Sequence, residues 1–229
     1  MDSNLSKLNK MNKIAVIGAN GRTGIEIVRQ ALEKNIVVKA LVRDKQKINI
    51  SNPNLEIIVG TPEHYKDVDQ AIREVDAVCV ALNICRKSDW PWSKVVSPYD
   101  LLDVSMKNIV KAMKENGINR VITISAWGTG DSYEETNWMF KFLINKTNVR
   151  YAYAGHEDQE RTLTQSGLDW TSIRPVGLNN KQKHKEILIR IKRNDPLKRM
   201  ISRKDVAKFI LDITDDERYF QTSPSISND

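Results

Sequence analysis

Three glycines near the start of the chain have the spacing of a turn that binds phosphate groups. They follow Lys13 and the apolar residues 14–17 in the pattern Gly-x-x-Gly-x-x-Gly, and a helical pattern of apolar residues comes directly after them. The first two glycines let the backbone turn and approach a pyrophosphate, and the third lets the helix pack close to the strand. Free N–H groups at the helix start then face the phosphates. The alternative is a tight strand-to-helix turn without a ligand. The residues predicted to form this dinucleotide-phosphate site are Gly18, Asn20, Gly21, Arg22, Thr23 and Gly24.

The next apolar run, residues 37–42, ends in a positive charge. Arg43 follows it, and Arg22 lies in the glycine turn. In NAD-binding proteins an acidic residue near this point bonds the ribose 2′-hydroxyl. Two guanidinium groups suit a 2′-phosphate instead, because the planar fork donates to phosphate oxygens in a bidentate way. We therefore expect NADP(H) as the cofactor, although Asp44 is also close and Arg43 could be a solvated charge at a strand end.

Polar or flexible residues also follow the other predicted strands. Ligands of open α/β sheets bind beyond the carboxyl ends of the strands, so these residues are further candidates for cofactor contact. They are Thr61, Ala81, Leu82, Asn83, Ser125 and Pro175. The nicotinamide is expected near Leu82, Ser125 and Pro175. The Ser125 hydroxyl is a candidate for orienting the substrate or bonding the carboxamide, and the alternative is a simple strand-end serine.

Two further sets of side chains are candidates for chemistry on the substrate. His156 is a candidate proton donor, since an unperturbed imidazole pKa of about 6.5 suits acid catalysis near neutrality. The alternative is a structural histidine on a helix. Four tryptophans follow the fourth and fifth predicted strands, namely Trp90, Trp92, Trp127 and Trp138. Their faces would sandwich a flat, conjugated acceptor such as a flavin, quinone or linear tetrapyrrole. Local packing or a dimer contact is the alternative for them.

Strand and helix patterns alternate along most of the chain. Strands are predicted at residues 13–17, 37–42, 55–59, 76–82, 120–125 and 169–174, and helices at residues 64–74, about 100–116 and about 155–166. Residues 187–191 are expected to form a short strand outside the main sheet, and Ser202 is expected to cap a last helix. The alternation predicts a doubly wound, parallel α/β sheet of the Rossmann-like kind. One domain over residues 12–229 is expected, with small C-terminal elements on the substrate side, after a flexible tail at residues 1–11.

Composition and charge limit the kinds of partner that the protein is expected to bind. The 229 residues carry a formal net charge of +7, but the basic residues are scattered apart from one denser region from Lys181 to Lys204, and no zinc finger or RNP-like motif accompanies them. A solvated basic surface therefore accounts for the charge better than nucleic-acid binding. Cys79 lies inside an apolar strand, and no residues have metal-ligand spacing, so we expect no metal and a reducing, cytoplasmic location. No segment is long enough to span a membrane, and we expect no membrane partner. A monomer or homodimer is expected.

Several motifs together resemble the atypical short-chain dehydrogenase/reductases of the NAD(P)-binding, NmrA-like group, most closely its flavin reductase and biliverdin reductase branch. The resemblance covers residues 13 to about 224. The blocks that carry it are residues 13–24, 41–44, 59–60, 67–69, 76–78, 108–114, 166–170 and 199–206. It implies an NADPH-dependent reductase of a planar acceptor and marks Ser125 as the active-site serine. Two departures stand out. Thr61 replaces an aspartate that meets the adenine, and the Tyr-x-x-x-Lys pair is missing, with His156 near the lysine position and Ala152 near the tyrosine position.

Two other functions compete with the reductase. The NmrA resemblance also permits a non-catalytic sensor of NADP(H) that binds a protein partner. An epimerase or dehydratase of nucleotide sugars is the weaker alternative, because the catalytic tyrosine and lysine are absent and the substrate domain would be short. Without a tyrosine acid, a hydride acceptor that takes its proton from solvent is easier to reduce than a ketone.

Overall fold

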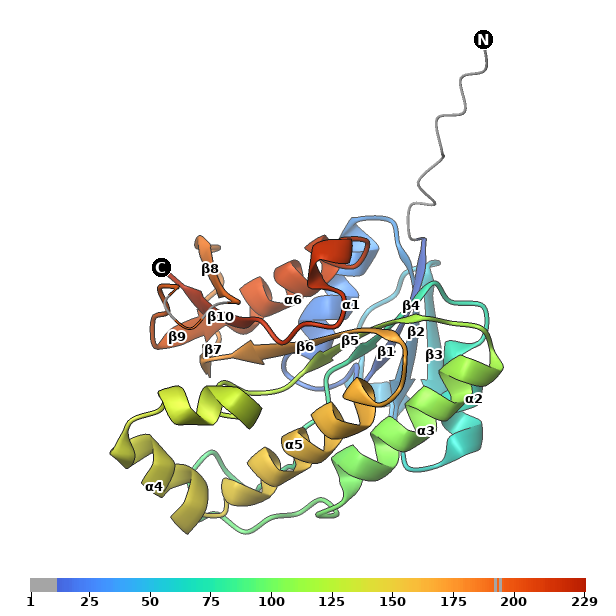
Figure 1. Ribbon diagram of the computed structural model, residues 1–229. Coiled ribbons are helices and arrows are strands. Elements are labelled where there is room, and N and C mark those ends of the chain that lie inside the picture. Colours follow the sequence, from blue (N-terminus) through green and yellow to red (C-terminus); the bar gives the residue numbers. More distant parts are fainter. Residues whose placement is uncertain (1–11, 192, 194) are drawn as a thin grey trace.

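An eight-stranded sheet forms the middle layer of the computed structural model, which describes residues 12–191, 193 and 195–229 (Figure 1). In sheet order its strands are β3 (Leu55–Val59), β2 (Val37–Val42), β1 (Lys13–Ile17), β4 (Ala77–Val80), β5 (Arg120–Ile124), β6 (Asp169–Pro175), β10 (Ser225–Asn228) and β8 (Ile187–Arg190). Neighbouring strands are parallel except β10 and β8, which are antiparallel. The predicted doubly wound, Rossmann-like α/β fold is confirmed.

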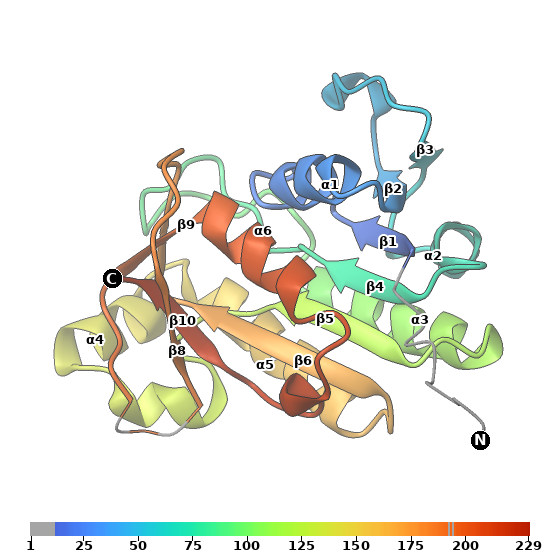
Figure 2. The same cartoon turned by 90° about the horizontal axis from the view of Figure 1, so that it is seen from above.

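Helices cover both faces of this sheet (Figures 1 and 2). On one face lie α1 (Gly24–Glu33) and α6 (Arg203–Asp212), and on the other lie α2 (Tyr65–Ile72), α3 (Leu101–Glu115) and α5 (Arg150–Thr164). Strand β1, which lies between these two layers of helices, has apolar side chains on both faces. In β1, Ile14 and Val16 pack into the core that contains α1 and α6, whereas Ala15 and Ile17 pack into the core under α2 and α3. Burial on both faces explains the continuous apolar runs from which the strands were predicted.

The C-terminal edge of the sheet differs from the prediction. The strand expected outside the main sheet is β8, its edge strand, so that expectation was wrong. It joins the sheet through β10, which was not predicted because its sequence, Ser-Ile-Ser-Asn, is mostly polar. Those polar groups are buried but paired. Ser227 Oγ accepts from the Lys198 N–H at 2.9 Å, and Asn228 Oδ1 accepts from the Ser202 N–H at 2.9 Å. A separate small sheet pairs β7 (Gly177–Asn179) with β9 (Met200–Ser202).

Helix ends agree with the sequence in some places and not in others. Ser202 caps α6 as predicted, its hydroxyl accepting from the Asp205 N–H at 2.9 Å. Helix α5, however, begins at Arg150 instead of near residue 155. Gly155 lies inside it because a Cβ there would come within 3.0 Å of a Leu102 methyl group of α3, so the glycine serves helix packing. The unassigned segment 127–150 contains a short 3₁₀ helix, η2 (Gly130–Glu135), and α4 (Trp138–Lys146). The tail expected at residues 1–11 lies outside the described residues.

Candidate cofactor and acceptor site

The glycine turn between β1 and α1 leaves no space for side chains. Gly18 has a φ of +84°, and a Cβ there would lie 2.7 Å from the Ala81 carbonyl oxygen at the end of β4. A Cβ on Gly24 would lie 2.2 Å from the Gly18 carbonyl oxygen. Thr23, at the N-cap of α1, forms no side-chain hydrogen bond to the helix start, so no cap competes with a ligand for its N–H groups. The residues present therefore fit a dinucleotide pyrophosphate, which needs close backbone approach at a helix start.

The two arginines of the predicted 2′-phosphate site have different surroundings. Arg43 is exposed at the end of β2. Arg22 points to the loop after β4, where its guanidinium donates to both Asp89 carboxylate oxygens at 2.9 and 3.0 Å. This bidentate pair raises the pKa of Arg22 and lowers that of Asp89. Their joint contact with a 2′-phosphate stays a prediction.

A basic hollow beside the glycine turn was not predicted. Its lining includes Arg22 of the turn together with Lys181, Arg203 and Lys204 from the C-terminal part of the chain. Arg203 is largely buried, and burial followed by repulsion from Arg22 lowers its pKa. A concentration of positive charge here suits phosphate groups. Residues 199–206 carry part of the family resemblance, but their spacing alone gives no signal that this block returns to α1.

The ends of β3 and β4 border the same edge of the sheet. Thr61 donates its backbone N–H to Asp67 at 2.9 Å and its hydroxyl to Glu63 at 3.1 Å, so its side chain is already engaged. Ala81 donates its N–H to the Ile17 carbonyl at 2.8 Å, which holds the end of β4 against β1. Leu82 is half-buried and Asn83 is exposed. Each of these residues therefore lies at a strand end, as the sequence predicted, and their contact with the cofactor stays a prediction.

Ser125 and Pro175 meet at the ends of β5 and β6. The Ser125 N–H donates to the Ile173 carbonyl at 2.7 Å, and the Trp127 N–H donates to the Pro175 carbonyl at 3.0 Å. Ser125 is only 3% exposed, and its hydroxyl has no hydrogen-bond partner among the described residues. A buried hydroxyl without a partner is costly. Contact of this hydroxyl with a ligand at the strand ends stays a prediction.

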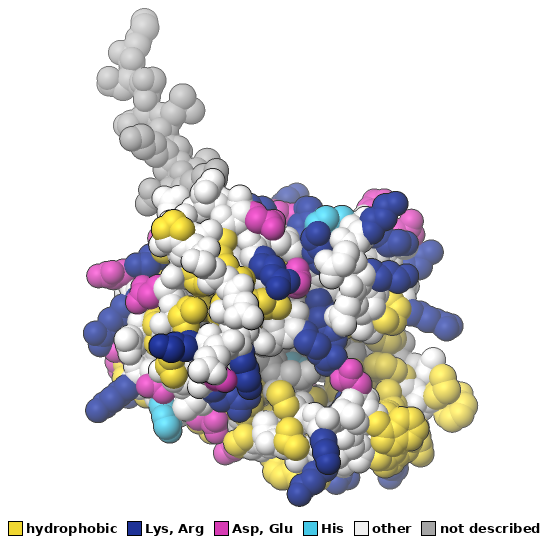
Figure 3. All heavy atoms as spheres, turned by 180° about the vertical axis from the view of Figure 1, so that it is seen from behind, with side chains coloured by type: hydrophobic (Ala, Val, Ile, Leu, Met, Phe, Trp, Pro, Cys, Tyr) yellow, Lys and Arg dark blue, Asp and Glu magenta, His cyan; other side chains and the backbone are white. Residues whose placement is uncertain are grey.

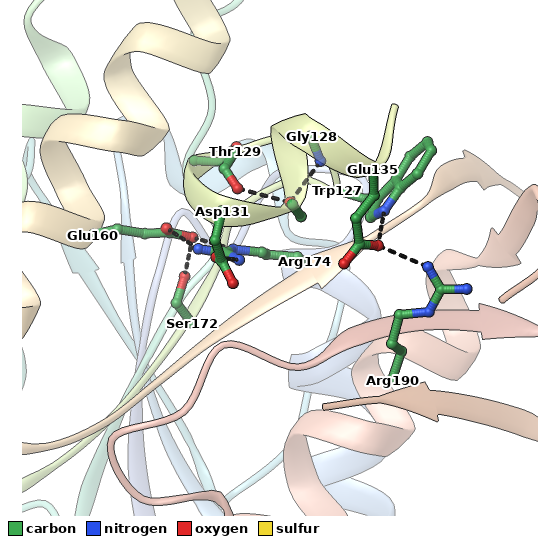
Figure 4. Close-up of polar contacts among 10 residues, drawn as sticks. Trp127, Gly128, Thr129, Asp131, Glu135, Glu160, Ser172, Arg174 and Arg190 are labelled. Carbon is green, nitrogen blue, oxygen red and sulfur yellow. Dashed lines mark hydrogen bonds and ion pairs between the residues drawn. The ribbon is translucent and has the colours of Figure 1, made fainter. Parts of the chain in front are cut away.

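An ion-pair network holds the segment after β5 in place (Figure 4). Arg174 of β6 donates to both Glu160 carboxylate oxygens at 2.7 and 3.0 Å and also pairs with Asp131 of η2. The same Glu160 accepts from the Ser172 hydroxyl at 2.8 Å. A second link joins Arg190 of β8 to Glu135 of η2 at 2.7 Å, beside the Trp127 indole. Sequence reasoning missed these contacts, since their members are far apart in the chain.

His156 does not have the environment of a proton donor. It is buried on α5, and burial lowers its pKa to about 4, against a small opposing effect of Glu160. The imidazole is therefore neutral near pH 7, and the premise of an unperturbed pKa was wrong. Tyr153, one residue from the tyrosine position counted in the sequence, donates its hydroxyl to the Trp127 carbonyl at 3.1 Å. Burial raises the pKa of Tyr153, which keeps its hydroxyl protonated.

The four tryptophans do not form one cluster of equal burial. Trp127 is partly buried, with its ring centroid 5.3 Å from that of Phe140. Trp90 and Trp92, 5.4 Å apart, and Trp138 are exposed on the surface. Of the four, Trp127 is the one whose backbone is bonded to the strand end beside Ser125.

Comparison with known proteins identifies the class. A family model described as NAD(P)H-binding matches residues 18–217, so the chain belongs to this NAD(P)H-binding family. An uncharacterized chloroplastic protein of Arabidopsis thaliana is 28% identical over 178 residues, which are 75% of this chain and 61% of that protein. The chain thus spans less than two thirds of that relative's length. A Bacillus subtilis protein named an uncharacterized sugar epimerase, YhfK, is 28% identical over 90% of this chain and 89% of its own.

Solved structures share the fold at low identity. A short-chain dehydrogenase/reductase from Veillonella parvula, solved in complex with NADP, superposes with a TM-score of 0.75 at 20% identity, covering 95% of both chains. ChuY, an anaerobilin reductase from Escherichia coli O157:H7, superposes with a TM-score of 0.76 at 18% identity, covering 95% of this chain and 97% of its own. Among the described helices, none is long and apolar enough to cross a membrane.

Proposed function

We propose that the protein is an NADPH-dependent reductase that passes hydride to a planar, conjugated acceptor such as a flavin, a quinone or a bilin-like molecule. The observation that carries the proposal is the buried, unpartnered Ser125 hydroxyl beside Trp127 at the ends of β5 and β6. The bilin-type reductase among the structural neighbours supports the acceptor class. With the acceptor class we also propose the finer placement in the NmrA-like group, nearest the flavin and biliverdin reductases.

The side chains divide the work simply. When bound, the nicotinamide supplies the hydride. Ser125 holds the carboxamide or the acceptor by its hydroxyl, and Trp127 offers a flat face for stacking. The proton comes from solvent, because the buried His156 is neutral near pH 7 and the Tyr153 hydroxyl is bonded to the Trp127 carbonyl.

The preference for NADP(H) over NAD(H) rests on Arg43, with Arg22 as its partner in the glycine turn. Each charge-assisted contact contributes ~1.5–3 kcal/mol, so Arg43→Ala should weaken NADPH binding by about ten- to a hundredfold and leave NADH binding almost unchanged. Lys45→Ala, which removes an exposed charge two residues on, is the matched control. Equal affinity of the parent protein for both cofactors in calorimetry would refute the preference.

The reductase itself is tested by NADPH oxidation with FMN, a quinone and a bilin, followed at the nicotinamide absorbance. Ser125→Ala should lower the turnover rate more than His156→Ala. Loss of a true general acid typically lowers the rate ~10²–10⁴-fold, and His156 is not expected to be one. Binding of NADPH with no turnover on any acceptor would favour the NADP(H) sensor. The cytoplasmic location and the monomer or homodimer stay predictions.

A sugar epimerase is the second candidate, favoured by the name of the Bacillus subtilis relative. Tyr153 would have to act as its acid–base residue, which its raised pKa and its bond to the Trp127 carbonyl oppose. Epimerisation of a nucleotide sugar by the parent protein, lost in Tyr153→Phe, would replace the reductase proposal.

A further inference from the structure

Helix α4 presents three of its six apolar residues to solvent, whereas Phe140, Leu143 and Ile144 are partly or fully buried. Of its nine residues, Ile144 is the one that is buried. Trp138 is 81% exposed, Met139 63% and Phe142 52%. A surface helix of a globular protein normally turns such residues toward the core. A helix with this arrangement is therefore built to contact something outside the chain.

The loop after β4 extends the same surface. Trp90 is 65% exposed and Trp92 51%. Asn148, just beyond α4, fastens the loop by donating its backbone N–H to the Pro91 carbonyl at 3.0 Å and its side-chain amide to the Trp92 carbonyl at 2.9 Å. We call residues 83–99 and 137–150 together the aromatic end. Hydrophobic side chains gather over the region of α4 in Figure 3.

The charge of the aromatic end selects its partner. These two segments contain six lysines and arginines and one aspartate, in a chain whose formal net charge is +7. Lys141 is paired with Glu134 of the neighbouring η2 at 2.9 Å, and Asp89 is paired with Arg22 of the glycine turn. Two copies of such a surface, face to face, would repel each other, so charge does not favour a second copy of this chain. Exposed tryptophan and phenylalanine interspersed with lysine are the side chains that settle at a lipid headgroup boundary.

We propose that the aromatic end docks the protein on the surface of a bilayer that contains anionic phospholipids. The apolar side chains of α4 and the Trp90–Trp92 pair enter the headgroup region, while basic residues such as Lys94 and Lys146 pair with lipid phosphates. Helix α4 is far too short to span a bilayer, so the contact is with the bilayer surface alone. It departs from the expectation, drawn from the lack of a spanning segment, that the protein has no membrane partner. The proposal does not depend on the identity of the acceptor.

The test is sedimentation of the full chain with vesicles of phosphatidylcholine containing about a quarter phosphatidylserine, and with vesicles of phosphatidylcholine alone. We expect binding to the anionic vesicles that weakens as salt is raised. Lys94→Ala with Lys146→Ala should lower the partition coefficient about 25-fold, since each basic residue near the surface is worth a factor of about five. Met139→Ser with Phe142→Ser should lower it about tenfold or more at unchanged charge.

Matched controls separate docking from general attraction of a basic protein. Lys66→Ala with Lys114→Ala removes the same charge from exposed positions on α2 and α3, and Ile191→Ser removes an apolar side chain of similar exposure, 57%, beyond β8. Both should bind vesicles nearly as the parent does, and all variants should keep their NADPH affinity. Equal losses in the variants and the controls, or no binding to anionic vesicles at low salt, would overturn the proposal. A dimer that forms without lipid in sedimentation velocity, and that Phe142→Ser dissociates, would also overturn the proposal, because the aromatic end would then bind a second copy of the chain.

Discussion

The glycine turn and the aromatic end both follow the carboxyl ends of strands of the main sheet but are built in opposite ways. The turn consists of backbone. Contiguous residues form it, and the spaces at Gly18 and Gly24 are closed by carbonyl oxygens. The aromatic end consists of side chains from segments that meet only in three dimensions, through contacts such as that of Asn148 with the Trp92 carbonyl. A backbone site depends on a few glycines at fixed spacing, whereas a side-chain site depends on the contacts that hold each segment in place.

The glycine turn and the side chains around Trp127 also depend on different physical quantities. In the turn, one methyl group decides whether α1 can approach β1. Near Trp127, the decisive quantities are charges, because the one guanidinium of Arg174 pairs with the carboxylates of both Glu160 and Asp131 where α5, β6 and η2 meet. The following substitutions probe the glycine turn and the side chains around Trp127, from the largest expected effect to the smallest.

Glu160→Gln should be the most damaging change. It leaves the buried Arg174 guanidinium without its main carboxylate, and removing one partner of a buried pair costs about 3–5 kcal/mol. The free energy of unfolding in urea measures the loss. Glu157→Gln, on the exposed side of the same helix, should change it by less than about 0.5 kcal/mol. Similar losses in both variants would mean that the network does not hold the segment after β5.

His156 should make stability depend on pH. Its pKa is about 4 in the folded protein and about 6.5 when exposed, so the unfolded chain binds more protons between these values. Its contribution is complete at pH 7, falls as pH drops below about 6.5, and reaches a loss of about 3 kcal/mol near pH 4. His156→Leu should flatten this part of the pH profile of unfolding, whereas His64→Gln, at an exposed position, should retain it. An unchanged profile in His156→Leu would contradict the burial argument.

Gly24→Ala should damage the cofactor end. The new methyl group would meet the Gly18 carbonyl at 2.2 Å, and overpacking of this kind costs about 1–3 kcal/mol. We expect NADPH affinity to fall about ten- to a hundredfold in fluorescence titration. Gly21→Ala is the graded control, because its methyl group would lie 3.2 Å from the same oxygen. A larger loss at Gly21 than at Gly24 would show that the turn is not limited by helix approach.

Trp127→Leu should have the smallest effect, confined to the acceptor. Ring stacking contributes ~0.5–1.5 kcal/mol beyond burial, so the acceptor KM should rise about two- to tenfold while NADPH affinity stays the same. Trp138→Leu, at the exposed start of α4, should leave this KM unchanged. The reverse result would place the acceptor at the aromatic end instead of beside Ser125.

Features that depend on residues close together in the sequence were predicted, and features that depend on residues far apart in the sequence were missed. The strands β1 to β6, the glycine turn and the Ser202 cap were predicted because each depends on neighbours within a few positions. The start of α5 was misplaced because Gly155 is needed for close packing against Leu102 on another helix, and it does not mark a helix end. The strand β10 was missed because the groups that satisfy its polar residues lie near Lys198 and Ser202, outside any local window.

The sequence alone determined the parallel α/β fold and the place of the phosphate turn, since spacing of apolar residues and glycines directly encodes backbone conformation. Tertiary structure alone decided which groups are buried, charged or free. It lowered the pKa of His156, left the Ser125 hydroxyl without a partner among the described residues, joined Glu160 to Arg174 and turned Trp138, Met139 and Phe142 of α4 outward. The physical reason is that burial and electrostatic environment arise from residues that meet only after folding, and no local pattern records which ones these are.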